Sequence, residues 1–432
     1  MLHLALGIIS VEFSIFSTVW GWSMIIFALY NILKYRNHHN AAGFFAAYLV
    51  GLEIVLRMTN AEIIWEFGKY GIVSLFLLGL TMENFKRHRI SVFIIIYIFS
   101  FFPSVFLVSY EDINIWRQFI SFNLSGPLSL FFSFLYFRNR KVFKYEIIRM
   151  LRMLLLPLIS MSMILIIRTP DLDEIVFTSE ANVQMSGGYG PNQVSSALGL
   201  IVAIIALSKI FNRTLFNKDI YDYTILGICS IQAYLTFARG GVLTAILSIF
   251  SAWLISLGQV KSKTLRAGKT VYVVIILLIL WGVAGDFTQG KMEQRYISIL
   301  NLTSDIENSR TGRLKIMAID LDIFMDNIIM GVGPGVAREL RFDYGYNKFV
   351  SAHSEFTRTL SEHGLFGLLG LCSLIFLSFR EYNHRKEQEK CILVCFAMIA
   401  ILTMLHSAMR LAMPGFIFGM AFLKIQLTEK HL

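Results

Sequence analysis

Long apolar blocks alternate with short polar connections along most of this chain. Five of the blocks contain no charged residue at all: 93–109, 153–167, 194–207, 241–257 and 271–283. A helix needs about 20 apolar residues to cross a bilayer core, and slightly shorter runs suffice where flanking side chains reach the interface or the bilayer thins. The pattern therefore predicts an all-α integral membrane protein.

We predict about 12–14 transmembrane helices within one polytopic membrane domain that spans residues 1–432. The first apolar block could instead be a re-entrant segment or two short helices. The expected spans lie at 6–31, 41–58, 67–84, 91–109, 113–136, 148–167, 193–210, 222–237, 240–257, 270–286, 364–379, 391–407 and 411–427.

Composition supports the membrane assignment. Hydrophobic residues make up 56% of the 432 residues and charged residues only 16%, with a mean hydropathy of +0.62. A soluble domain usually carries about 25% charged residues. Each of the four cysteines lies within an apolar block, which predicts packing roles and neither a disulfide framework nor a zinc site.

The formal net charge of +10 is concentrated in alternate connections between the apolar blocks. Short cytoplasmic loops carry such an excess of lysine and arginine. The pattern therefore predicts that these connections share the cytoplasmic side, with the N-terminus outside and the C-terminus inside; an extra break near Trp20 would place both termini inside. The basic clusters are Lys34/Arg36, Lys86/Arg87/Arg89, Arg138/Arg140/Lys141/Lys144, Lys209/Arg213/Lys218, Lys261/Lys263/Arg266/Lys269, Arg380/Arg385/Lys386/Lys390 and Lys424/Lys430.

The opposite side receives the remaining connections. They are an acidic loop at 171–180 that leads into 187–192, a short turn at 238–240, and the longest polar stretch of the chain, 286–363. Loops of that length are usually functional or disordered. Because this stretch carries helical patterns, we expect an extracytoplasmic loop subdomain at 287–363 that contains short helices.

Arg239 lies between two apolar blocks and is followed by Gly240 and Gly241. An arginine at the end of a span is costly unless it is paired. It either reaches toward lipid headgroup phosphates or serves as a fixed anion-binding group in a cavity. The two glycines allow a close backbone approach and mildly favour a site.

Arg310 and Arg313 stand three residues apart where a helical pattern begins, with Ser309 or Thr311 as a possible cap. An apolar stripe follows at Leu314, Ala318, Leu321 and Met325. The two arginines share a helix face. They form either a solvated basic face or a phosphate site at a helix N-terminus.

His353 precedes the next apolar block and is followed by Ser354 and Glu355. The unperturbed pKa of histidine, about 6.5, suits proton transfer from a sugar hydroxyl, although a histidine at a membrane boundary is often only a hydrogen-bonding residue. We expect Glu355 and Glu362 to pair with Arg358 on the exterior. Gly364 and Gly367 fall in a small-residue stripe that suits tight helix packing.

Two further motifs are interpreted structurally. The stretch Gly331-Val332-Gly333-Pro334-Gly335 lacks the surrounding βαβ unit of a dinucleotide site and predicts a sharp turn. Asp171-x-Asp173 has the form of a metal motif, but we interpret it as part of a solvated acidic loop.

The order of these motifs resembles the O-antigen polymerase and O-antigen ligase superfamily. The resemblance covers mainly residues 186–380. Ser354 departs from the asparagine that usually follows the family's histidine. The matching pieces are Gly190-Pro191-Asn192, Arg239-Gly240, Arg310 to Arg313, Gly331 to Gly335, and His353-Ser354-Glu355-Phe356 with Leu360, Glu362, Gly364 and Gly367.

The resemblance implies transfer of a glycan from undecaprenyl pyrophosphate to a sugar hydroxyl at the periplasmic face of the bacterial cytoplasmic membrane. It implies no metal and no cofactor. Arg239 and Arg313 would bind the donor diphosphate and His353 would orient or deprotonate the acceptor hydroxyl. Arg310, Asn192, Gly333, Ser354 and Glu355 would assist in substrate binding.

The implied partners are the lipid-linked glycan donor, a glycan acceptor, membrane lipids and other polysaccharide-assembly proteins such as a chain-length regulator, with no nucleic acid. A polymerase that joins repeat units is favoured, because the departure at Ser354 is typical of the variable polymerases. A ligase that moves finished polymer to lipid A core is the alternative. A transporter or flippase is disfavoured, since transporters often contain inverted repeats and the sequence shows none.

Overall fold

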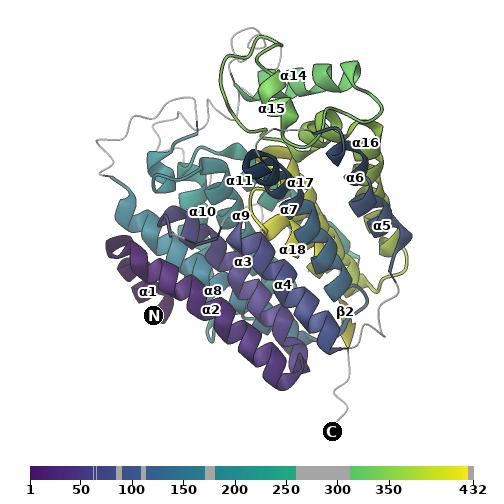
Figure 1. Cartoon of the computed structure of the whole chain (residues 1–432). Coiled ribbons are helices and arrows are strands. Elements are labelled where there is room, and N and C mark those ends of the chain that lie inside the picture. The colour runs from purple at the N-terminus through teal and green to yellow at the C-terminus, as the bar shows by residue number, and fades with distance from the viewer. Residues whose placement is uncertain are drawn as a thin grey trace.

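The computed structural model describes residues 1–61, 63–64, 66–83, 90–108, 113–170, 181–258 and 312–426. This part of the chain is an all-α membrane protein (Figure 1). The predicted span at 270–286 and the acidic loop at 171–180 lie outside it. Within these described ranges, eight helical segments are long and apolar enough to cross a membrane: α2 (Ser14–Tyr35), His38–Met58 containing α3 (Ala41–Met58), α7 (Ile113–Phe137), α8 (Lys144–Arg168), α9 (Pro191–Ile210), α11 (Arg239–Leu257), α16 (Glu355–Tyr382) and α17 (Glu387–Ser407).

Other predicted spans are shorter or broken in the structure. The first block forms two helices that meet at Phe13, α1 (Leu2–Glu12) and α2, and α2 runs unbroken past Trp20. The block at 91–109 is divided between α5 (Val92–Phe99) and α6 (Phe102–Val105). The remaining short helices of the bundle are α4 (Phe67–Met82) and α10 (Asp219–Leu235).

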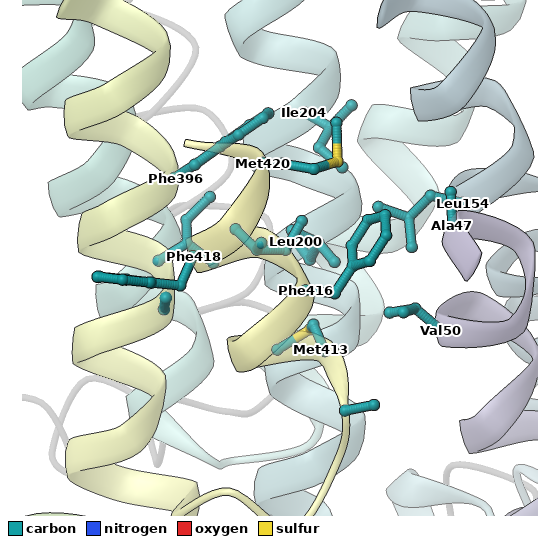
Figure 2. Close-up of a cluster of buried hydrophobic side chains, with 14 of the residues drawn as sticks. Ala47, Val50, Leu154, Leu200, Ile204, Phe396, Met413, Phe416, Phe418 and Met420 are labelled. Carbon is teal, nitrogen blue, oxygen red and sulfur yellow. The ribbon is translucent and has the colours of Figure 1, made fainter. Parts of the chain in front are cut away.

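The last predicted span, 411–427, is replaced by an eight-residue helix, α18 (Met413–Met420), and a short strand, β2 (Lys424–Gln426). All the residues of α18 are buried. Figure 2 shows Phe416, Phe418 and Met420 surrounded by side chains of α3, α8, α9 and α17. Gly415 and Gly419 bring the α18 backbone against α7, where a Cβ at either position would overlap Leu130 or Ser133. An apolar run thus forms a core element that is too short to span.

The described basic connections gather at one end of the bundle, as the charge pattern predicts. The clusters at 86–89 and 261–269 and Lys430 lie outside the described residues. Arg140 donates to Asn40 at 2.8 Å and to both carboxylate oxygens of Glu83 at 2.7–2.8 Å. Lys141 starts a three-residue strand, β1 (Lys141–Phe143), that pairs in parallel with β2, so that Lys141 is the register partner of Lys424. These contacts define the basic end of the molecule.

The opposite end carries the described part of the predicted loop subdomain. It contains α14 (Arg313–Asp326) and α15 (Val336–Leu340), which lie together above the bundle in Figure 1. Its small apolar core consists of Ile316, Ile319, Ile323, Ala337 and Tyr346.

The predicted helix at 313 onward is confirmed, but the apolar stripe that predicted it is not the face that the structure buries. Leu314, Leu321 and Met325 are exposed, and Ile316, Ile319 and Ile323 are buried instead. Both stripes are apolar with helical spacing. The buried stripe is the one that includes Asp320, whose carboxylate forms an ion pair with Arg341.

A sharp bend divides α16 at Gly364, where φ is +59° and ψ is −142°. The predicted span began at this glycine, whereas the helix begins nine residues earlier at Glu355. The bend leaves the carbonyls of Ser361 and Glu362 to accept hydrogen bonds from the N–H groups of Val332 and Gly333, at 3.0 and 2.9 Å. The glycine turn at 331–335 therefore lies directly against the bend and fixes it.

We expect Gly364→Ala to destabilise the protein by about 2 kcal/mol or more, because alanine disfavours this backbone conformation. An added Cβ would also lie 2.5 Å from the Ile328 carbonyl oxygen. The measurement is the thermal unfolding temperature of the detergent-solubilised protein. Gly227→Ala in α10 is the matched control, since a Cβ there meets no atom within 4 Å. Equal unfolding temperatures for the two variants would contradict the role given to the bend.

Candidate functional site

Several helices begin or end together at the end of the bundle opposite the basic end. α9 begins at Pro191, α11 at Arg239 and α14 at Arg313, while α17 ends at Ser407. A helix N-terminus carries a partial positive charge and free N–H groups, which favour anions. None of these three N-termini has a side-chain cap.

Arg239 is held at this end by contacts of the residues on either side of it. Ser195 of α9 donates to the Ala238 carbonyl at 2.7 Å. Gly240 lies directly against the ring of His406, and a Cβ at Gly240 would overlap that ring. The glycine after Arg239 is thus required for a close approach of α11 to α17, as the sequence favoured. Arg239 itself is half-buried.

Arg313, the first residue of α14, lies within electrostatic range of His353 and of His406. The structure thus brings Arg313 and His353 together, and it places Arg239 next to the glycine that contacts His406. Arg310, the second arginine of the predicted pair, lies outside the described residues.

His353 is half-buried, and its Nδ1 is a buried atom with no hydrogen-bond partner among the described residues. The hydroxyl of the adjacent Ser354 is also buried without a partner. Burial lowers the pKa of His353 to about 3, and the positive charges of Arg410, Arg313 and Arg341 contribute. The imidazole is therefore neutral at physiological pH and retains a nitrogen that can accept a proton.

Asn192 lies in the first turn of α9, directly after Gly190 and Pro191. Its Oδ1 is buried and has no hydrogen-bond partner in the described structure. Its backbone carbonyl accepts from Ser196, whose hydroxyl also lies 3.0 Å from Nε2 of His406. Asn192 thus belongs to the same group of side chains as His406.

Two of the predicted substrate-binding residues have internal partners. The backbone of Gly333 adopts φ +96°, bonds to Glu362 and lies against Val108. The Glu355 carboxylate is bound to Arg358, and its Oε2 also accepts from the Met409 N–H at 3.2 Å. In this structure both residues hold the site together.

The predicted pairing of Arg358 with Glu355 and Glu362 occurs, but the prediction that it lies on the exterior is wrong. All three side chains are buried, with exposures of 8%, 2% and 3%. Nη1 of Arg358 donates to Glu362 and to Oδ1 of Asn123, both at 2.7 Å. Sequence spacing allowed the pairing but could not show that this face of α16 lies against α7.

Sequence reasoning missed Arg410, which lies in the connection between α17 and α18. Its Nη2 donates to the carbonyls of Ser351 and Ala352 at 3.1 and 2.9 Å. Ala352 directly precedes His353, so Arg410 fixes the backbone that carries the histidine. The signal was present: Arg410, like Arg239, is a lone arginine in a short break between two apolar blocks.

A cavity of about 520 Å³ adjoins Arg410. Its lining combines aromatic side chains with charged ones, an arrangement typical of sites that bind a polar ligand with an extended surface. Among the lining residues are Phe119, Phe122, Phe349, Arg338, Arg341 and Arg410. In the described part of the chain, no group of three or more histidine, cysteine, aspartate or glutamate side chains is arranged to hold a metal.

Comparison with protein families finds that residues 224–372 match the family described as O-antigen ligase. The match extends from α10 into α16 and includes Arg239, Arg313 and His353, whereas Asn192 and Arg410 lie outside it. A comparison with curated proteins finds no match.

We expect Arg358→Met to destabilise the protein by about 3–5 kcal/mol, because it leaves two buried carboxylates without a cation. The triple variant Arg358→Met, Glu355→Gln, Glu362→Gln removes all three charges and should recover much of this loss. Thermal unfolding of the detergent-solubilised variants measures both effects. A triple variant that is less stable than Arg358→Met would contradict the assignment of the loss to unpaired charge.

Proposed function

We propose that this protein polymerises undecaprenyl-diphosphate-linked oligosaccharide repeat units into surface polysaccharide. The proposal is based on its membership of the O-antigen ligase and O-antigen polymerase superfamily of membrane glycan-processing enzymes. The reaction takes place at the end of the bundle opposite the basic end. By the positive-inside rule this end faces the periplasm, across the bacterial cytoplasmic membrane.

One observation carries the proposal. Arg313 lies within electrostatic range of both His353 and His406, and Gly240, the residue after Arg239, lies directly against His406. A diphosphate leaving group gains negative charge as its bond to the sugar breaks. Fixed donors in a site shielded from water stabilise such charge more strongly than water does. The half-buried Arg239 is assigned to this task together with Arg313, which is exposed at the start of α14, and with Arg310 as an additional ligand.

His353 acts on the other reactant. The acceptor hydroxyl oxygen forms a bond to the anomeric carbon of the donor sugar, and the bond from that carbon to the diphosphate oxygen breaks. The bonding electrons leave with undecaprenyl diphosphate. The hydroxyl proton passes to the free Nδ1 of His353, which has no other partner in the described structure. Ser354 and Asn192 contribute further polar atoms for the sugars.

The arginines around His353 make its basicity depend on whether the donor is bound. Burial and the charges of these arginines lower the pKa of His353 to about 3, so the imidazole by itself is a weak base. A bound diphosphate supplies negative charge among the same arginines and raises the pKa of the histidine. The donor therefore strengthens the base that the acceptor needs, which favours transfer to a sugar only when the donor is in place.

A ligase that transfers finished polymer to lipid A core is the second candidate, because the matching family is described as O-antigen ligase. The two reactions share the donor and differ in the acceptor, so the same arginine and histidine roles apply. Membrane lipids surround the bundle in either case, and a chain-length regulator would be a partner of a polymerase.

The direct test supplies purified protein in lipid vesicles with synthetic undecaprenyl-diphosphate oligosaccharide repeat units as the sole substrate. We expect a ladder of products, and a fall in rate of about 100-fold or more for Arg239→Ala, Arg313→Ala and His353→Ala. Gel electrophoresis of the released glycans measures both the ladder and the rate at which it forms. Lys315→Ala is the matched control; Lys315 is an exposed residue of α14 whose Nζ donates to the Gly345 carbonyl and lies 5.9 Å from the centre of the Tyr346 ring.

Two results would decide against a polymerase. Product that forms only after lipid A core is added, with no ladder from repeat units alone, would identify a ligase. Normal ladders from all three alanine variants would remove the proposed chemistry altogether, because the reaction would then proceed without the arginines and the histidine.

The pH dependence tests the coupling between donor and base. In the free enzyme the depressed pKa keeps His353 neutral down to about 3, so kcat/KM should not fall on its account through mildly acidic pH. In the donor complex the pKa is higher, so kcat should fall at a higher pH than kcat/KM does. Initial rates at a series of pH values measure both profiles. A fall of both at one shared pH would contradict the coupling.

A further inference from the structure

Arg410 lies at the junction between the group around His353 and the 520 Å³ cavity. Nη2 of its side chain is bound to the two carbonyls that precede His353, and the same side chain lines the cavity. Among the described residues no hydrogen bond reaches its Nε or Nη1, and no carboxylate forms an ion pair with it. The guanidinium of this cavity-lining residue therefore has donor atoms, Nε and Nη1, that the described residues do not use.

Two buried carboxylates fix the connection that carries Arg410. Oε2 of Glu355 accepts from the Met409 N–H at 3.2 Å, and Oε2 of Glu53 accepts from the Ala412 N–H at 2.7 Å. These bonds come from α16 and α3 and hold the backbone on both sides of Arg410. Because Ala408, Met409, Leu411 and Ala412 are all buried, the arginine is presented by a rigid segment.

Three arginines, Arg313, Arg57 and Arg341, lie within electrostatic range of Arg410, while the carboxylates of Glu355 and Glu53 bond the backbone on either side of it and not its guanidinium. Burial lowers its pKa; Tyr189 opposes this effect, whereas the nearby Arg313, Arg57 and Arg341 reinforce it. Arg57 is paired with Glu53 and Glu66, and Arg341 is paired with Asp320. Arg410 has only neutral carbonyl oxygens as its bonded partners.

A half-buried cation with carbonyl partners and neighbouring cations is electrostatically incomplete, and an anion would complete it. This inference rests on the proposed function, in which the anion at this position is the diphosphate of the lipid-linked donor. We propose that Arg410 is a further diphosphate ligand, which donates from Nε and Nη1 to phosphate oxygens while Nη2 holds the backbone of His353. The residue thereby joins the donor diphosphate to the histidine that receives the acceptor proton.

The alternative is that Arg410 only braces the backbone at Ser351 and Ala352. The two roles predict that different properties are lost when Arg410 is replaced. If Arg410 only holds the backbone, its loss affects turnover and folding but does not change the preference of the protein for a diphosphate over a monophosphate lipid. A ligand with two free donor atoms contributes to binding of a diphosphate, and charge-assisted hydrogen bonds of this kind change affinity by about 10- to 100-fold.

The experiment measures competition. Undecaprenyl diphosphate and undecaprenyl monophosphate are each titrated as inhibitors of glycan polymerisation by the full-length protein in vesicles, and direct binding of both lipids is measured in parallel. The variants are Arg410→Ala, Arg410→Lys and, as the charge-matched control, Lys315→Ala. Thermal unfolding of each variant reports whether the bundle is intact.

We expect wild-type protein and the Lys315→Ala control to bind the diphosphate lipid more tightly than the monophosphate. Arg410→Ala should lose about tenfold or more of its diphosphate affinity and most of that preference. Arg410→Lys, which keeps the charge but loses the planar fork, should fall between the two.

An Arg410→Ala protein that is folded and keeps the wild-type diphosphate preference would overturn the assignment and leave Arg410 as a brace. Wild-type protein that neither polymerises nor binds the diphosphate lipid would overturn the proposed function itself, together with this inference. The two failures are distinguished by the behaviour of the wild-type protein.

Discussion

A charge in an apolar bundle needs an opposite charge, and this constraint governs the site end of the molecule. Lys69 is bound to Glu66 at 2.5 Å, Arg341 to Asp320 at 2.7 Å, and Arg358 to Glu355 and Glu362. Each pair joins elements that are distant in the sequence or fixes the start of a helix. Arg410 differs, because the residues on either side of it in the sequence are apolar and its bonded partners are carbonyl oxygens. The contrast separates cations that hold the fold from a cation with capacity for a ligand.

The same carboxylates that neutralise these cations also position the site. Glu355 binds Arg358 and the backbone of Met409, and Glu53 binds Arg57 and the backbone of Ala412. The bend at Gly364 then links α16 to the glycine turn at 331–335. His353 and Arg410 are consequently fixed by the interior of the bundle and not by the surface loops alone.

The sequence predicted the long apolar helices well, because an unbroken run of about 20 apolar residues has few alternatives in a membrane. It also predicted the gathering of the basic connections at one end. It failed for α18, since an apolar run does not reveal whether it crosses a bilayer or ends inside a bundle. It did not indicate which of two apolar stripes of α14 is buried, and it failed for the bend at Gly364, which depends on contacts with Ile328 and Gly331.

The candidate site was predictable only in part. Arg239, Arg313 and His353 could be identified from motif order, and their placement at one end followed from the charge pattern. The burial of the Glu355–Arg358 pair, the bond of Glu355 to Met409 and the backbone bond of Gly333 could not be, because they depend on which face of α16 meets α7 and the glycine turn. Arg410 was within reach of the reasoning that identified Arg239, but it stands outside the matching motifs, so spacing gave it no partner.

The most direct test of the account is an experimental structure of the full-length protein in lipid with undecaprenyl diphosphate bound. The account predicts density for the diphosphate at the end of the bundle opposite the basic end, within hydrogen-bonding distance of Arg239, Arg313 and Arg410 and next to His353. Diphosphate density at the basic end, or at a position that none of these arginines reaches, would contradict it.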